Sequence, residues 1–132
     1  MRLLQIGDSE SVARLSEMLA SEGVAVERWR EGDPAAGGAA EIAALAHDLR
    51  ELERALVNGG PDAVLLASDS TASLAAVVVA TKVGTPVAAL PLQSADGAGA
   101  NATLIRQLAD VTLAPEPAAI AEWVTGIYTH PR

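Results

Sequence analysis

The stretch PDAVLLASDSTASLAAVVVA, residues 61–80, contains the strand and the helix that decide the fold. Asp62–Ala67 is a continuous apolar run, which is typical of a strand covered on both faces of a sheet. Thr71–Val83 follows as an apolar helix, and the small polar residues Ser68 to Thr71 separate the two. A buried strand that leads directly into a buried helix is the unit from which parallel sheets are built, so this stretch predicts an α/β fold.

The same alternation of strand and helix continues along the rest of the chain. The expected strands are Arg2–Ile6, Val24–Trp29, Asp62–Ala67, Pro86–Leu90 and Val111–Ala114. The expected helices are one capped by Asp8 or Ser9 and ended by Gly23, about Ala40–Val57, Thr71–Val83, Ala102–Ala109 capped by Asn101, and Pro117–Tyr128. Right-handed crossovers leave few topologies, so we predict a Rossmann-like three-layer sandwich whose five-stranded parallel sheet has the order 2-1-3-4-5.

The length and composition suit one small domain. The chain has 132 residues, which we assign to a single domain at 1–128 and a short tail at 129–132. It contains two Trp, one Tyr and no Phe, so the core must be built from Ala, Val, Leu and Ile. The longest helix is expected to bury a stripe made of Ile42, Leu45, Leu49, Leu52 and Leu56.

The charge and the absence of cysteine exclude several classes of function. The net charge is −8 and the nine basic residues are scattered, which argues against binding to nucleic acid or to an anionic membrane surface. There is no cysteine for disulfides or thiolate metal sites, and His47 and His130 stand alone, so we expect neither a metal nor a cofactor. The sequence shows no signal peptide and no membrane-spanning run, which favours a cytoplasmic location.

Two polar corners are expected at the same edge of the sheet. One follows the first strand and the other follows the third, and ligands of open parallel sheets bind at the carboxyl ends of the strands. The free N–H groups at the start of the helix after Ser70 favour an anion, and the hydroxyls of Ser70, Thr71 and Ser73 add donors. The candidate ligand-binding residues are therefore Gly7, Asp8, Ser9, Ser68, Asp69, Ser70 and Thr71.

Other interpretations of these residues stay open. Asp69 or Ser70 also suits a plain helix cap that binds nothing. Neither a Walker motif nor G-x-G-x-x-G occurs, and the glycine-rich end of the loop Gln93–Ala100 is more typical of a connection than of a phosphate cradle. Asp8 and Asp69 are also compatible with the acidic pocket of a receiver domain, but Ala-Pro-Glu at 114–116 stands where that site needs a lysine.

The stretch Pro61–Val124 resembles the N-terminal domain of the non-hydrolysing UDP-N-acetylglucosamine 2-epimerases, which have the GT-B glycosyltransferase fold. PDAVLLASDSTAS is similar to the family's PDxVLVxGDT strand and helix, and VGTPVAALPL is similar to its G(I/V)PVAHVEAG strand. NATLIRQLADVTLAPEP is similar to the NRRLIDHLAD helix and the LLFAPTE that follows it. IGDSESVARLSEML stands where the family has a FGTRPEAIK turn. The order and spacing of these motifs agree over about half of the chain.

The departures from the family's motifs bear on catalysis. Asp69 stands at the aspartate of the GDT motif, but Ala89 and Pro91 stand where the family has His and Glu. Arg106 replaces the Asp of the LID helix, and Ser9 replaces the Arg of the first loop. Epimerisation needs positioned acids and bases, which Ala and Pro cannot supply. No counterpart of the family's second domain is present, so the resemblance implies a degenerate, single-domain relative that is not a self-sufficient epimerase.

The helix Thr71–Val83 also suggests a partner. It has no polar face between Leu74 and Ala80, which is typical of a helix that is buried all round. Because a sheet covers one side only, we expect another subunit to cover the rest, with Leu74, Val77 and Val78 at the interface. The N-terminal domains of the resembled family pair in their dimers, so the resemblance implies a homodimer. Neighbouring helices of the same chain are the alternative cover.

Three functions follow from these observations. The first is a non-catalytic module, dimeric, that binds a small anionic or sugar ligand or acts through interaction. The second is one half of a split GT-B glycosyltransferase or sugar epimerase whose nucleotide-binding domain, a separate chain, would be the partner. The third is a purely structural assembly domain without a ligand.

Overall fold

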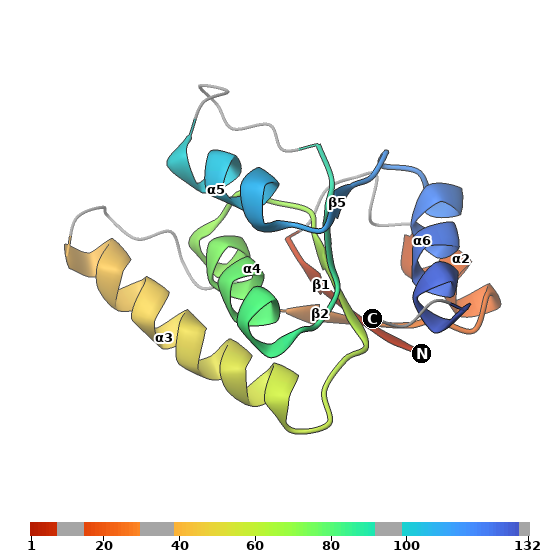
Figure 1. The fold of residues 1–132 in the computed structure, drawn as a ribbon, viewed down its shortest axis with the longest axis horizontal. Helices are drawn as coiled ribbons and strands as arrows, with labels where there is room; N and C mark the ends of the chain where they lie inside the picture. Colours follow the sequence, from red (N-terminus) through yellow and green to blue (C-terminus); the bar gives the residue numbers. More distant parts are fainter. Residues whose placement is uncertain (8–14, 30–38, 92–98, 130–132) are drawn as a thin grey trace.

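The computed structural model describes residues 1–7, 15–29, 39–91 and 99–129 (Figure 1). Its strands are β1 (Arg2–Ile6), β2 (Ala25–Trp29), β3 (Ala63–Leu66), β4 (Val87–Ala89) and β5 (Val111–Thr112). Its helices are α2 (Leu15–Ser21), α3 (Ala39–Val57), α4 (Thr71–Val83), α5 (Ala100–Leu108) and α6 (Pro117–Thr129). The strands form a parallel sheet in the order β2-β1-β3-β4-β5, so the predicted topology is confirmed.

The sheet separates two layers of helices, as Figure 1 shows, with α3, α4 and α5 on one side and α2 and α6 on the other. Successive residues of a strand point to opposite faces. Leu4 and Ile6 of β1 accordingly pack in the core with α3, α4 and α5, whereas Leu3 packs in a second core with α2 and α6. The three-layer sandwich expected from the sequence is therefore confirmed.

Two local predictions were wrong. The N-cap of α5 is Gly99 rather than Asn101, and no side chain caps this helix. Ile42 was expected in the buried stripe of α3, but its side chain is 67% exposed. Burial increases along α3 from its half-buried middle to Leu52 and Leu56, because the first turns of the helix extend beyond the core (Figure 1).

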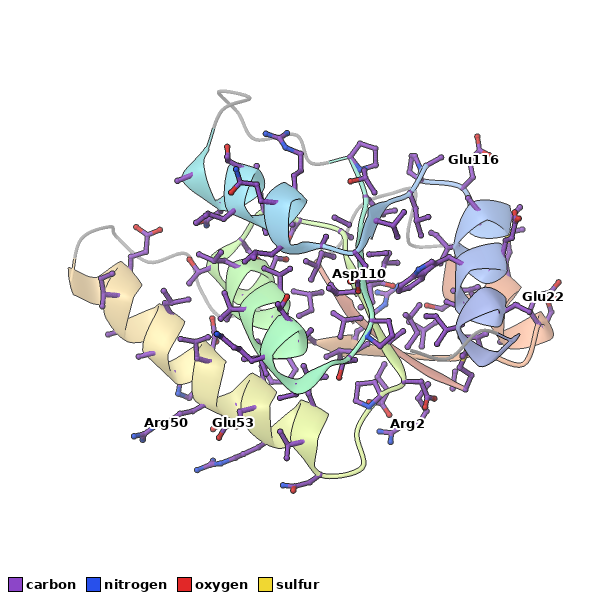
Figure 2. All side chains as sticks on the ribbon, in the orientation of Figure 1. Arg2, Glu22, Arg50, Glu53, Asp110 and Glu116 are labelled. Carbon is purple, nitrogen blue, oxygen red and sulfur yellow. The ribbon has the colours of Figure 1, made fainter. Side chains whose placement is uncertain are left out.

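The outer face of α3 carries the charged side chains that the sequence places there. Arg50 and Glu53 project away from the sheet (Figure 2). Arg54 lies on the same exposed side and forms an ion pair with Glu51, whose N–O distance is 3.1 Å. Ion pairs this exposed add little to stability, so α3 is held mainly by its buried leucines.

Helix α4 lies between α3 and α5 in its layer (Figure 1). Most of its alanines and valines are buried, so neighbouring helices of the same chain supply most of the cover that the sequence analysis assigned to a partner. Val77 is fully buried within the chain, whereas Leu74 and Val78 keep part of their surface exposed. The homodimer stays a prediction, and of the three expected interface residues only Leu74 and Val78 offer surface to a second subunit.

Candidate functional site

Gly7, which follows β1, lies against Ser68, which follows β3, at the carboxyl edge of the sheet. Ile6 is paired with Leu66, and the N–H of Ala67 donates to the carbonyl of Ile6 at 2.8 Å. Gly7 has a φ of 91°, and a Cβ built on it would lie 2.5 Å from the Cβ of Ser68. Only glycine permits this conformation together with so close an approach. We call this junction the Gly7–Ser68 corner.

Three serines of the corner form a hydroxyl cluster, made of Ser68, Ser70 and Ser73. The Oγ of Ser68 lies 3.0 Å from that of Ser70 and 2.9 Å from that of Ser73, whose side chain is fully buried. Ser70 is the N-cap of α4, and its Oγ accepts a hydrogen bond from the N–H of Ser73 at 3.2 Å. Of the two residues expected as a possible cap, Ser70 is therefore the one that caps α4.

The cap leaves the first two N–H groups of α4 without a partner inside the helix. The N–H of Ser73 bonds to the Ser70 hydroxyl and that of Leu74 bonds to the Ser70 carbonyl. Thr71 and Ala72 precede them and have no carbonyl one turn back to bond within the helix. These two N–H groups, at the positive end of the helix dipole, are the ones that a ligand oxygen would meet.

Asp69 lies where the N-terminal ends of α4 and α5 meet. Its backbone carbonyl accepts a hydrogen bond from Nδ2 of Asn101 at 3.1 Å, although the two residues are 32 positions apart. Asn101 belongs to the first turn of α5, so this bond fixes the start of α5 beside the corner. The Asp69 side chain is half-buried, and its carboxylate has no hydrogen bond or ion pair among the described residues.

Gln5, which is not among the residues predicted from the sequence, is buried beneath the same corner. Its side chain is 1% exposed, and its Nε2 donates to the carbonyl of Gly7 at 3.0 Å. A carbonyl oxygen only accepts, so the amide cannot be turned the other way round. Oε1 is then left buried, without a hydrogen-bond partner in the described part of the chain. A buried acceptor of this kind costs about 1–3 kcal/mol.

The remaining candidate residues are placed as follows. Asp8, Ser9 and most of the Gln93–Ala100 loop lie outside the described residues. Ala89 is fully buried in β4, and Pro91 is exposed just beyond it. The contacts bring three serines, two amides and one aspartate together at the corner. Gln5 and Ser73 are buried, so the partly exposed Ser68, Asp69, Ser70 and Asn101 are the ones that can form hydrogen bonds with a hydroxyl-bearing ligand. They include no second titratable side chain for acid–base chemistry.

Two further kinds of feature are absent from the described ranges. No cluster of three or more His, Asp or Glu side chains is arranged to hold a metal ion. None of the helices described combines the length and the apolar character needed to cross a bilayer.

The Ser70 cap gives a first prediction. Replacing Ser70 with alanine is expected to lower the free energy of unfolding by about 1 kcal/mol, because the N–H of Ser73 loses its acceptor. Urea denaturation measures the change. Ser21→Ala is the matched control, since it removes an exposed hydroxyl that bonds to the Met18 carbonyl, and it should change stability by less than about 0.5 kcal/mol. Equal effects of the two variants would contradict a capping role.

The fold has counterparts among solved structures. The UDP-GlcNAc 2-epimerase of Methanocaldococcus jannaschii, in complex with UDP-GlcNAc and UDP, superposes with a TM-score of 0.70 at 19% sequence identity, over 96% of this chain and 44% of that one. MnaA of S. aureus, with UDP, gives a TM-score of 0.66 at 17% identity, over 95% and 40% of the two chains. A putative UDP-N-acetylglucosamine 2-epimerase from Listeria monocytogenes gives 0.62 at 16% identity, over 95% and 42%.

These similarities define the class of fold. The chain spans less than half the length of each epimerase, which is consistent with a single N-terminal-like domain of that architecture. The resemblance drawn from the sequence motifs is thus confirmed at the level of the fold. No protein-family model matches the sequence, and the comparison with curated proteins finds no match either.

Proposed function

We propose that this chain is a non-catalytic binding module, with the fold of an epimerase N-terminal domain, that takes a small sugar or anionic ligand at the Gly7–Ser68 corner. The observation that carries the proposal is the close approach of Gly7 and Ser68, which are far apart in the sequence, at the carboxyl edge of a parallel sheet. This is the edge where open α/β sheets bind their ligands.

The chemistry of the corner supports a ligand that carries both hydroxyl and anionic groups. The carboxylate of Asp69, which has no partner among the described residues, is an acceptor for a ligand hydroxyl, and the N–H groups of Thr71 and Ala72 are donors for a ligand oxygen. Small side chains around them allow a ligand to approach the backbone. Ala89 and Pro91 carry no acid or base, which supports binding without epimerisation.

Nucleotide sugars are the first ligands to test, since the M. jannaschii epimerase holds UDP-GlcNAc and UDP. Titration of the purified chain with either compound is expected to give heat in a calorimeter and to raise the melting temperature. A ligand at a hundred times its dissociation constant adds about 2.7 kcal/mol to stability. No heat and no change in melting with either compound, or with free GlcNAc and phosphate, would overturn the ligand proposal.

Asp69→Asn tests the role of the carboxylate. The variant keeps the shape of the side chain but loses its charge, so we expect binding at least about tenfold weaker, a loss of about 1.4 kcal/mol, with little change in stability. Glu53→Gln is the matched control, because it removes one negative charge from an exposed position of α3 and should bind as the original chain does. If Asp69→Asn binds unchanged, Asp69 has no part in recognition.

A second candidate function is favoured by the partial coverage of the relatives. The chain corresponds to 44% of the M. jannaschii epimerase, so it is proposed alternatively as one half of a split GT-B enzyme with a separate nucleotide-binding chain. This alternative predicts co-purification with a second polypeptide of similar size, and sugar-modifying activity only in the mixture. A purified chain that sediments as a stable dimer by itself would favour the binding module.

A further inference from the structure

A groove of about 520 Å³ runs along α6, on the opposite face of the sheet from α4. Its lining residues are Leu113, Ala119, Glu122, Trp123, Gly126 and Ile127. All except Leu113 belong to α6 and recur every three or four residues, so they form one stripe along the helix. We call this feature the α6 groove.

The groove borders the face by which α6 joins the core, and its lining residues Leu113, Trp123 and Ile127 also pack against that core. Ile120 and Val124 are almost completely buried and pack in the second core with Leu19 of α2. Trp123 and Ile127 lie beside them and are only half-buried, while Glu122 is exposed. Helix α6 therefore presents a second, largely apolar stripe that the described part of the chain covers only in part.

Gly126 is the least expected residue of this stripe. Glycine inside a helix is less favourable than alanine, so it needs a structural reason. Gly126 does not have a positive φ, and a Cβ built on it would meet nothing within 4 Å. Neither its backbone conformation nor its packing against the described residues explains why Gly126 is a glycine. A glycine does let a second backbone approach the helix closely, and Ala119, one heptad earlier, is also small.

Trp123, one turn before Gly126 in α6, also indicates that a partner contacts this stripe. Its ring is half-buried, and its indole N–H has no hydrogen bond among the described residues. Tryptophan is enriched at the centres of protein interfaces, where the ring is covered and the N–H finds an acceptor. A partner seated in the α6 groove would complete both contacts.

The charge of the groove indicates the kind of partner. Its charged lining residue is Glu122, on a chain whose net charge is −8. In a symmetric dimer the same patch meets itself, so Glu122 would face the same acidic surface of its copy. Charge complementarity instead favours a basic partner. We propose that the α6 groove binds an apolar helical segment of another protein that carries Lys or Arg opposite Glu122.

Designed peptides test this proposal on the full chain. Trp29→Phe leaves Trp123 as the single tryptophan reporter, with the fold checked by circular dichroism. An amphipathic helical peptide of Leu and Lys is expected to shift the Trp123 emission to shorter wavelength and to saturate at micromolar concentration. The matching peptide of Leu and Glu is expected to bind at least tenfold more weakly. Equal binding of the two peptides would overturn the proposal.

Variants in the same Trp29→Phe background separate the groove from general charge attraction. Glu122→Lys is expected to weaken the Lys peptide at least tenfold, whereas Glu53→Lys on the far layer makes the same charge change and leaves binding intact. Gly126→Leu fills the groove and abolishes binding, while Gly126→Ala raises the melting temperature of the free chain. The assignment would be overturned if Glu122→Lys and Glu53→Lys weakened peptide binding equally, or if Gly126→Leu bound the peptide fully. It would also be overturned if the chain formed a dimer that Gly126→Leu dissociates.

Discussion

Replacing Gly7 with alanine is expected to lower the free energy of unfolding by about 2–5 kcal/mol. The residue has a φ of 91°, where an L side chain costs about 1–2 kcal/mol. The added Cβ would also lie 2.5 Å from the Cβ of Ser68 and 2.9 Å from its backbone nitrogen. The bond from Ala67 N–H to the Ile6 carbonyl holds β1 and β3 together, so relief of this overlap costs about 1–3 kcal/mol more. Urea denaturation measures the sum.

Gly23→Ala is the matched control for this prediction. Gly23 has a similar φ of 82°, but a Cβ there would meet nothing within 4 Å, so only the backbone cost of about 1–2 kcal/mol remains. The difference between the variants isolates the contact with Ser68. Adding Ser68→Gly to Gly7→Ala should recover part of that difference, because the Cβ and hydroxyl that cause the overlap are removed. Equal losses at Gly7 and Gly23 would mean that the two turns separate at little cost.

The sequence predicts the sheet well because its signals are local. The apolar run at Asp62–Ala67 and the helix at Thr71–Val83 are each recognisable within one window, and chirality then fixes how such units connect. The convergence of Gly7 with Ser68 follows from that topology alone, since neighbouring parallel strands end at the same edge. Fold and location of the corner are therefore predictable without knowledge of any side-chain contact.

The contacts inside the corner are less predictable. The neighbours of Asn101 in sequence suggest a helix cap, but its side-chain amide donates to the carbonyl of Asp69. No local sequence pattern predicts a hydrogen bond between residues 32 positions apart. The cover of α4 was assigned to a second subunit, because a sequence does not show that α3 and α5 pack on either side of it. Gln5 is recognisable in the sequence as a polar residue inside the apolar strand LLQI. Its hydrogen-bond partner, the carbonyl of Gly7, is not predictable from that pattern.

Gln5→Glu tests most directly whether the side-chain amide of Gln5 is buried as a hydrogen-bond donor beneath the corner. An ionised carboxylate has no proton to donate to the Gly7 carbonyl and would be buried without a partner. The introduced carboxyl is therefore expected to stay protonated in the folded chain, with its pKa raised by burial above the ordinary value of about 4.3. Holding it neutral at pH 7 costs about 1.4 kcal/mol per pH unit, which predicts a loss of about 3–4 kcal/mol.

The pH dependence of that loss identifies its cause. A group whose folded-state pKa is raised is best accommodated below its unfolded pKa, and the variant loses stability relative to the original chain as the pH rises from about 4 to 7. At low pH the protonated carboxyl can donate its O–H to the Gly7 carbonyl as the amide does, so most of the loss should disappear. Gln5→Met, which removes the amide and the orphaned Oε1 together, should show a smaller, pH-independent change. Denaturation curves for the original chain, Gln5→Glu and Gln5→Met at pH 4 and pH 7 give the comparison. If Gln5→Glu lost the same free energy of unfolding at both pH values, water would reach the carboxyl, and the amide of Gln5 would not be excluded from solvent beneath Gly7.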